Sequence, residues 1–185
     1  MNMCCQLYLR AVNHCPFSDE KLWCRYGNVF SCIQKRTLRS CCMRLHDVVP
    51  PPEQITVVDP GAATRERLQQ QYGVRTLPVA DASLAQADVV VWAVKPQQFH
   101  EAATAAAAHL AQALHISVAA GITTATLARW LGSARIVRCM PNTPALVGQG
   151  MTGIYAAPGV TQQERALADA VLAPTGQRMW LRSEE

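Results

Sequence analysis

The sequence predicts an α/β protein with a doubly wound parallel sheet, and two patterns support this fold class. From Glu53 onward, short apolar runs alternate with helical patterns, as expected when each strand is followed by a helix. One run, DVVVWAV at Asp88–Val94, is apolar throughout, which is typical of a strand covered on both faces. With 50% hydrophobic and 16% charged residues among 185, the chain has a globular composition.

The expected elements follow one another through the remainder of the chain. Apolar runs predict strands at Ile55–Asp59, Val74–Leu77, Asp88–Val94, Leu114–Ala119, Ala134–Cys139, Met151–Ala157 and Gln177–Leu181. Helical spacing or alanine content predicts helices at Ala63–Tyr72, Gln97–Ala113, Thr123–Leu131 and Thr161–Leu172, with at most one turn at Ser83–Gln86. Gly73 is expected to end the first helix, and Thr123 or Thr124 to cap the third.

The composition changes near residue 48. Seven of the eight cysteines lie at or before Cys42, and residues 1–48 carry seven Lys/Arg against three Asp/Glu, whereas residues 49–185 carry ten of each. The leader shows no sustained period of a strand or a helix. We interpret residues 1–48 as a Cys-rich, basic leader that is disordered or non-native, such as an altered gene start would produce.

Two other interpretations of the leader stay open, a zinc module and an organelle-targeting segment. The candidate zinc ligands are His14, Cys15, Cys24, Cys32, Cys41, Cys42 and His46. Their spacing contains no C-x-x-C knuckle, so no metal site is predicted. Because the net positive charge is confined to the leader, we expect no nucleic-acid partner for the rest of the chain.

No run reaches the roughly 20 strongly apolar residues of a membrane helix. The stretch from Ala102 to Ala120 comes nearest, and it is interrupted by polar residues such as His109 and Gln112. We expect a soluble, cytoplasmic protein without membrane contact.

Three loops are expected where parallel α/β sheets bind ligands, beyond the carboxyl ends of the strands. They are Ala93–Gln97, Ala119–Ile122 and Met140–Pro144. Lys95 would bring a positive charge to this edge. The alternatives are local: Lys95 as a solvated strand end, Gly121 as a turn residue, Asn142 as part of a structural turn and Asp59 as a helix-capping acid.

A literal G-x-G-x-x-G at Gly148, Gly150 and Gly153 does not predict a phosphate site. The dinucleotide fingerprint follows a strand and opens a helix, whereas these glycines follow a loop and lead into an expected strand. No Ser/His/Asp arrangement is visible, and Cys139 is expected to be a small buried residue rather than a nucleophile. His100, His109 and His115 are expected at helix surfaces or strand starts.

Three motifs resemble, in order and spacing, the NAD(P)H-binding region of the pyrroline-5-carboxylate reductases. They are ADVVVWAVKPQ at Ala87–Gln97, ISVAAGIT at Ile116–Thr123 and RCMPNTPALVGQGMTG at Arg138–Gly153. The resemblance extends over residues 49–185. It implies a partial Rossmann-like domain and the NAD(P)H-dependent reduction of 1-pyrroline-5-carboxylate to L-proline, the last step of proline biosynthesis.

The resemblance also implies site residues. The cofactor-binding residues would be Asp59, Ala93, Val94, Lys95, Pro96, Val118 and Ala120, and the substrate-side loop would be Met140, Pro141, Asn142, Thr143 and Pro144. An acid at Asp59 would favour NADH by contacting the ribose, and Arg65 nearby would offset it, so NADH and NADPH both stay open. Ala80 stands where the family often has Asn, which removes one ribose contact.

Two departures from the family lead to further expectations. The family's first strand and G-x-G-x-x-G loop are replaced by the leader, so we expect the first βα unit, with its pyrophosphate site, to be missing and neighbouring strand edges to be exposed. We also expect the family's helical dimerisation domain, with its SGSGPAY-like motif, to be absent, so no catalytic residue is assigned.

We therefore expect a truncated reductase that is inactive in isolation, in a family that forms homo-oligomers. The alternatives are a non-catalytic fragment that docks with a full-length homologue, or another imine or β-hydroxyacid reductase.

Overall fold

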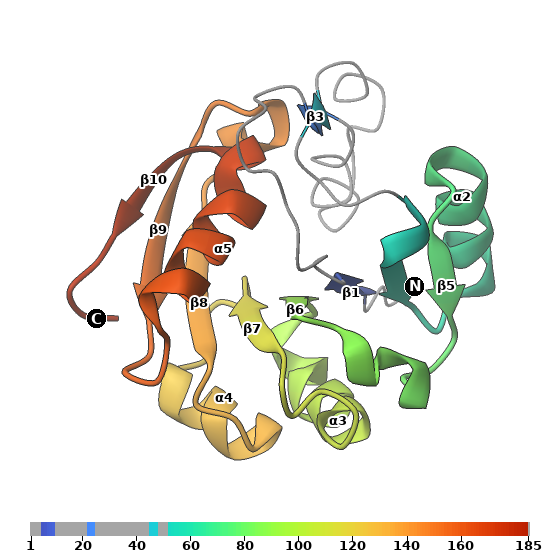
Figure 1. Cartoon of the computed structure of the whole chain (residues 1–185), viewed down its shortest axis with the longest axis horizontal. Helices are drawn as coiled ribbons and strands as arrows, with labels where there is room; N and C mark the ends of the chain where they lie inside the picture. The colour runs from blue at the N-terminus through green and yellow to red at the C-terminus, as the bar shows by residue number, and fades with distance from the viewer. Residues whose placement is uncertain (1–4, 10–21, 25–44, 48–51, 185) are drawn as a thin grey trace.

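An eight-stranded sheet forms the centre of the molecule, with strands in the order β10-β9-β8-β7-β6-β1-β4-β5 (Figure 1). The computed structural model describes residues 5–9, 22–24, 45–47 and 52–184. The strands of this sheet are β1 (Cys5–Leu9), β4 (Ile55–Val58), β5 (Arg75–Leu77), β6 (Val89–Ala93), β7 (Leu114–Ser117), β8 (Ile136–Pro141), β9 (Gly150–Ala156) and β10 (Gly176–Trp180). A separate pair joins β2 (Leu22–Cys24) to β3 (Leu45–Asp47).

Helices connect most of the parallel strands. The α-helices are α2 (Ala62–Tyr72), α3 (Pro96–Ala107), α4 (Thr124–Leu131) and α5 (Gln162–Leu172). Short 3-10 helices lie at η1 (Pro52–Gln54), η2 (Ala82–Gln86), η3 (Thr143–Val147) and η4 (Ala173–Thr175).

The predicted doubly wound α/β class is confirmed, with two antiparallel junctions that the sequence did not predict. Strands β4 and β5 pair in parallel, as do β6, β7 and β8 in turn. Strand β9 runs antiparallel to β8 because the short η3 segment is all that joins them, and a parallel return needs a crossover of a dozen or more residues.

The second antiparallel junction corrects the expectation of an empty central position. Strand β1, from the N-terminal leader, lies between β4 and β6 and pairs antiparallel with both. Leu7 is in register with Val57 on one side and Val91 on the other. Within the described sheet, the facing edges of β4 and β6 are therefore paired and not exposed.

Helices cover both faces of the sheet. Helices α3 and α4 pack together against one face of β6 to β8, and α5 lies on the opposite face (Figure 1). The ring of Phe99 on α3 lies 5.1 Å from that of Trp92 on β6 and 6.1 Å from that of Trp130 on α4. Because β6 is covered on both faces, all five of its residues are buried, as its continuous apolar run predicted.

Two helix ends show where local signals succeed and fail. Helix α2 ends at Gly73, whose backbone is left-handed at φ 68°, as predicted. Helix α3 ends at Ala107, six residues before the predicted end at Ala113. Turns after Ala107 bury Leu110 and bring the chain back to β7, so tertiary packing overrides the helical propensity of alanine.

His115 lies at the start of strand β7, as expected, and is fully buried there. Its Nδ1 accepts a hydrogen bond from Trp92 Nε1 at 3.0 Å, and the two rings stack at 6.0 Å. The pKa of His115 is lowered from 6.5 to about 4, chiefly by burial and also by the charge of Arg135, while a hydrogen bond with the Leu110 backbone opposes the shift. His115 is therefore neutral at pH 7, with its proton on Nε2.

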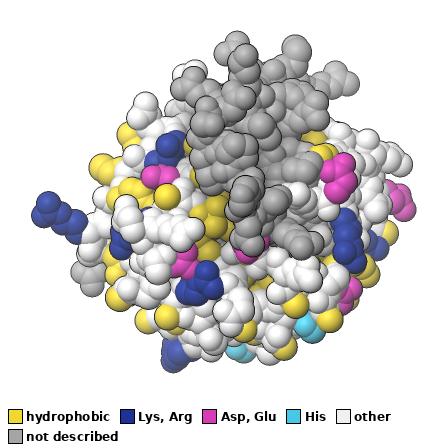
Figure 2. Space-filling model, viewed as in Figure 1, with side chains coloured by type: hydrophobic (Ala, Val, Ile, Leu, Met, Phe, Trp, Pro, Cys, Tyr) yellow, Lys and Arg dark blue, Asp and Glu magenta, His cyan; other side chains and the backbone are white. Residues whose placement is uncertain are grey.

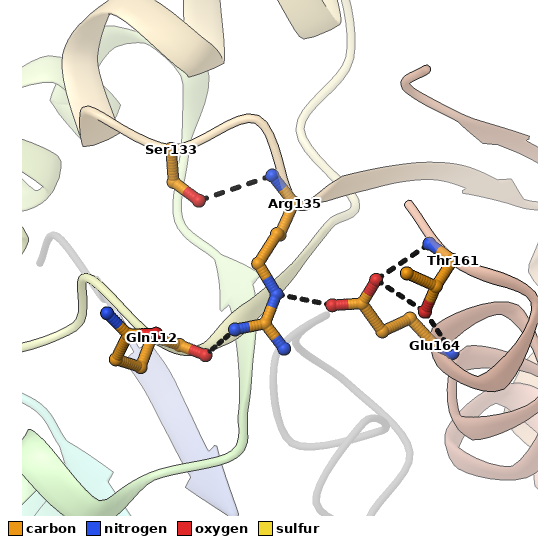
Figure 3. Close-up of polar contacts among 5 residues, drawn as sticks. All are labelled: Gln112, Ser133, Arg135, Thr161 and Glu164. Atoms are coloured by element: carbon orange, nitrogen blue, oxygen red, sulfur yellow. Dashed lines mark hydrogen bonds and ion pairs between the residues drawn. The ribbon is translucent and has the colours of Figure 1, made fainter. Parts of the chain in front are cut away.

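A polar network ties the start of β8 to the start of α5 (Figure 3). Arg135 forms an ion pair with Glu164 and donates a hydrogen bond to the Gln112 carbonyl. Glu164 and Thr161 form a capping box, in which Thr161 N donates to Glu164 Oε2 at 2.7 Å. Burial raises the pKa of Glu164, but hydrogen bonds from Thr161 and Arg135 outweigh it and lower the pKa overall.

Most of the leader lies outside the described residues, and with it most of the predicted disordered segment and the candidate zinc ligands. Within the part of the chain that the structure describes, no group of three or more His, Cys, Asp or Glu side chains could hold a metal ion. No helix in that part combines the length and apolar character needed to cross a bilayer.

We expect His115 to make folding pH-dependent. Between pH 6.5 and about 4, the unfolded chain binds a proton at this residue and the folded chain does not. The free energy of unfolding should thus decrease by roughly 3 kcal/mol as the pH falls through this range. Urea unfolding of the wild type and of His115→Asn, which keeps an acceptor for Trp92, measures the difference. An equal decrease in both proteins would contradict the prediction.

We expect Arg135→Ala to lower the free energy of unfolding by about 1–3 kcal/mol, because Glu164 then stays largely buried without its cation. The Glu164 side chain is 10% exposed in the ion pair. Arg178→Ala is the control, because its partner Asp169 is 41% exposed, and such pairs contribute about 0–1 kcal/mol. Urea unfolding tests both variants, and equal losses would show that the burial of Glu164 has no effect.

Candidate functional site

The carboxyl ends of β6, β7 and β8 lie side by side at one edge of the sheet. In register, Trp92 pairs with Ser117, and Ser117 pairs with Arg138. Because neighbouring strands are about 5 Å apart, the loops that leave these strands lie within roughly 10 Å of one another. The three predicted site loops are thus brought together at this edge.

The loop after β6 places a cation beside the start of a helix. Ala93 ends the strand and Val94 is buried, with 6% and 3% of their surface exposed. Lys95 is exposed and precedes α3, whose first residue is Pro96. Both the ammonium group and the positive end of the α3 dipole are suited to an anionic ligand.

The loop after β7 presents a small, open surface. Val118 is half-buried, its N–H donating to the Trp92 carbonyl at 3.2 Å, and Ala120 is exposed. Gly121 has φ +76°, and a Cβ built there would meet no atom within 4 Å. A flat group could therefore approach this backbone closely.

The loop after β8 is held by its asparagine. Met140 and Pro141 are the last residues of the strand, and Met140 is 46% exposed. Asn142 Oδ1 accepts a hydrogen bond from Met151 N at 3.0 Å, which anchors the loop to β9. Asn142, Thr143 and Pro144 are all exposed. The interpretation of Asn142 as a turn residue thus has structural support, while the exposed side chains leave the loop available to a ligand.

The glycines of the literal G-x-G-x-x-G serve packing within the described chain. Gly150 and Gly153 lie in strand β9 and open no helix. A Cβ at Gly150 would lie 2.7 Å from Ala145 atoms, so this glycine allows η3 to lie against the strand. The prediction that this motif is not a dinucleotide fingerprint is confirmed.

Asp59 lies apart from the three loops, on the far side of β1. It follows β4, is 1% exposed, and its Oδ1 accepts a hydrogen bond from Gly61 N at 2.7 Å. Arg65 on α2 donates from Nη1 to the Asp59 carbonyl oxygen at 2.7 Å. The carboxylate thus shapes the turn into α2, and the guanidinium group stands at the same strand end.

Cys139 has the buried, structural character that was predicted. It is 1% exposed, and its thiol donates to the Ser117 carbonyl at 3.4 Å. Burial raises its pKa to about 12, so the thiolate is not available as a nucleophile at neutral pH.

Sequence reasoning missed a carboxylate at this edge. Glu184 accepts hydrogen bonds from the backbone and the hydroxyl of Thr124, at 2.9 and 3.2 Å, and pairs with Arg138 at 3.6 Å. Thr124 and Glu184 are 60 residues apart, so no local pattern could predict the contact.

A nicotinamide dinucleotide fits this edge in part. The β6 and β7 loops offer an open glycine, a cation and the N-terminus of α3. The phosphate side differs, because β1 runs antiparallel and its carboxyl end, Leu9, pairs with Val89 and Ile55 at the opposite edge. The carboxyl end of β1 therefore lies away from the edge where the three loops meet, whereas the phosphate loop of a dinucleotide-binding domain leaves its first strand at that edge.

Charge is mixed rather than gathered on the face seen in Figure 2, where the Lys and Arg side chains of the described residues lie scattered among Asp and Glu. The absence of a nucleic-acid partner stays a prediction.

The family described as "NADP oxidoreductase coenzyme F420-dependent" matches residues 26–121. The chain belongs to this family. The matched range begins inside the N-terminal 48 residues and includes β4 to β7.

Curated relatives of this chain include several pyrroline-5-carboxylate reductases. The chain is 40% identical over 136 residues to the pyrroline-5-carboxylate reductase of Pseudomonas aeruginosa. The aligned region covers 72% of this chain and 50% of that protein. The corresponding enzyme of Haemophilus influenzae is 39% identical over the same shares. The predicted resemblance to pyrroline-5-carboxylate reductases is confirmed, and the chain spans about half the length of the curated relatives it matches.

Solved structures similar to this chain also include pyrroline-5-carboxylate reductases. The pyrroline-5-carboxylate reductase of Coxiella burnetii superposes with a TM-score of 0.66 at 36% identity, covering 72% of this chain and 50% of that one. The Plasmodium falciparum enzyme, solved with NADP bound, gives 0.54 at 25% identity, covering 60% and 43%. Prephenate dehydrogenase of Aquifex aeolicus, at 14% identity and a TM-score of 0.53 over 66% and 50% of the two chains, shares the fold alone.

Proposed function

We propose that this chain is the cofactor-binding part of an NAD(P)H-dependent pyrroline-5-carboxylate reductase. The observation that carries the proposal is the convergence of the Lys95, Val118 and Met140 loops at one edge, in a chain 40% identical to such an enzyme. The substrate would be the small cyclic imine 1-pyrroline-5-carboxylate and the product L-proline. The reaction would take place in the cytoplasm, and the active assembly would be a homo-oligomer.

The residues divide into two groups by position. Ala93, Val94, Lys95 and Pro96 would line the cofactor, with the Lys95 ammonium group facing its negative charge. Val118 and Ala120 would support the nicotinamide ring beside the open backbone of Gly121.

The substrate side is the neighbouring loop of Met140, Pro141, Asn142, Thr143 and Pro144. A bound NAD(P)H supplies the hydride that adds to the C=N carbon, while the ring nitrogen takes a proton. The chain's own contribution is to hold the two reactants next to each other and away from water.

The geometry favours NADPH over NADH. The Asp59 carboxylate already accepts a hydrogen bond from Gly61, which leaves it less able to bind a ribose hydroxyl pair. The Arg65 guanidinium group lies at the same strand end and could pair with a 2′-phosphate.

Binding of NADPH tests the proposal directly. At a concentration of about 100 times the Kd, a ligand stabilises the folded state by about 2.7 kcal/mol, which corresponds to a rise in Tm of roughly 5–10 °C for a chain of this size. Differential scanning fluorimetry with NADPH, with adenosine as control, measures the shift. The absence of any shift specific to NADPH would contradict the proposal. The isolated chain is expected to be inactive, so we expect no pyrroline-dependent loss of absorbance at the NADPH band, and such a loss would contradict that expectation.

Arg65→Gln should weaken NADPH binding by about tenfold and leave NADH binding within about twofold, because only NADPH carries the phosphate. Fluorescence titration with both cofactors gives the ratio of the two dissociation constants. Arg129→Gln, an exposed position on α4, is the control. Equal weakening of NADH and NADPH by Arg65→Gln would show that Arg65 does not select the phosphate.

A further inference from the structure

The Glu184 carboxylate joins two elements that are far apart in the sequence. Its Oε2 accepts from Thr124 N at 2.9 Å and lies 3.6 Å from Arg138 Nη1, while its Oε1 accepts from the Thr124 hydroxyl at 3.2 Å. The Arg138 group also donates to the Glu184 carbonyl at 3.5 Å. One residue thus bonds both to the first turn of α4 and to β8.

Each contacted element leads into one of the candidate loops. Thr124 is the first residue of α4, separated from the Val118–Ile122 loop only by the helix cap Thr123, and it is 7% exposed. Arg138 stands two residues before Met140, where the substrate-side loop leaves β8. A contact that joins Thr124 to Arg138 therefore constrains the spacing of the two loops.

The hydrogen bonds and the ion pair of Glu184 are stabilised by charge. A carboxylate at a helix N-terminus is stabilised by the free N–H groups and by the helix dipole, and an ionised partner strengthens each hydrogen bond. The side chains of Arg138 and Glu184 are only 18% and 21% exposed, so water screens the pair less than it would a surface pair.

We propose that Glu184 is a positioning residue, whose carboxylate fixes the Val118–Ile122 loop relative to the Met140–Pro144 loop. In terms of the proposed function, on which this role rests, it would set the distance between the nicotinamide ring and the imine. The residue touches neither reactant and acts through Thr124 and Arg138.

Hydrogen exchange followed by mass spectrometry tests the link without any cofactor. Glu184→Gln keeps the shape of the side chain and removes its charge. The amides of Ala119, Ala145 and Met151, which are hydrogen-bonded within or beside the two loops, should exchange about tenfold faster in this variant. The amides of β6 should keep their wild-type rates, as expected if the core stays folded.

Matched variants distinguish the loss of the Glu184–Arg138 ion pair from a general destabilisation of the fold. Arg138→Lys should retain wild-type exchange, whereas Arg138→Gln should reproduce the effect of Glu184→Gln. A high concentration of NaCl should speed loop exchange in the wild type and leave it unchanged in Glu184→Gln. Glu101→Gln, an exposed glutamate on α3, should have no effect.

Three results would overturn the proposal: unchanged loop exchange in Glu184→Gln, an equal change in Glu101→Gln, or acceleration spread evenly over the sheet. A titration with NADPH is read separately. If wild-type protein binds no NADPH, the proposed function fails while the exchange result still decides whether Glu184 links the loops. If it binds, Glu184→Gln should raise the Kd for NADPH several-fold.

Discussion

The sheet depends on the strand that pairs between β4 and β6. Strand β6 is buried along its whole length, so an unpaired edge there would leave several backbone N–H and C=O groups without water or partners. Strand β1 satisfies this edge and that of β4 together. It also joins the small unit of β4, α2 and β5 to the larger unit of β6 to β10. Hydrogen bonding at this position thus requires a strand but does not dictate its direction.

Direction matters for ligands, because loops bind them at one edge only. The strands β6, β7 and β8 end together, so the loops that follow them lie at the same edge of the sheet. The carboxyl end of the reversed β1 lies at the other edge. The two ends of a bound dinucleotide would therefore meet protein surfaces that differ in how far they are preformed. The nicotinamide end would meet preformed loops, while the phosphates would depend on Lys95 and the first turn of α3. This asymmetry follows from backbone register alone.

The sequence predicted the strands and helices of residues 52–184 closely where the signal is local. A continuous apolar run located β6, and Gly73 and Thr123 marked helix ends through specific backbone and side-chain bonds. Non-local features escaped prediction. The end of α3, the antiparallel sense of β9 and the placement of β1 are decided by packing and connection length. In the site, the three loops could be predicted from their order, while the Glu184 contact could not, since nothing near either partner indicates the other.

Asp59 illustrates how one side chain can limit what evolution or engineering can change. It stands where dinucleotide-binding domains often discriminate between cofactors, yet its carboxylate also holds the turn into α2 through Gly61. A substitution there would disturb the turn as well as any ribose contact. Arg65 takes part in the same turn, because its guanidinium group donates to the Asp59 carbonyl. A change of cofactor preference at either residue would therefore also have to preserve the fold of this turn.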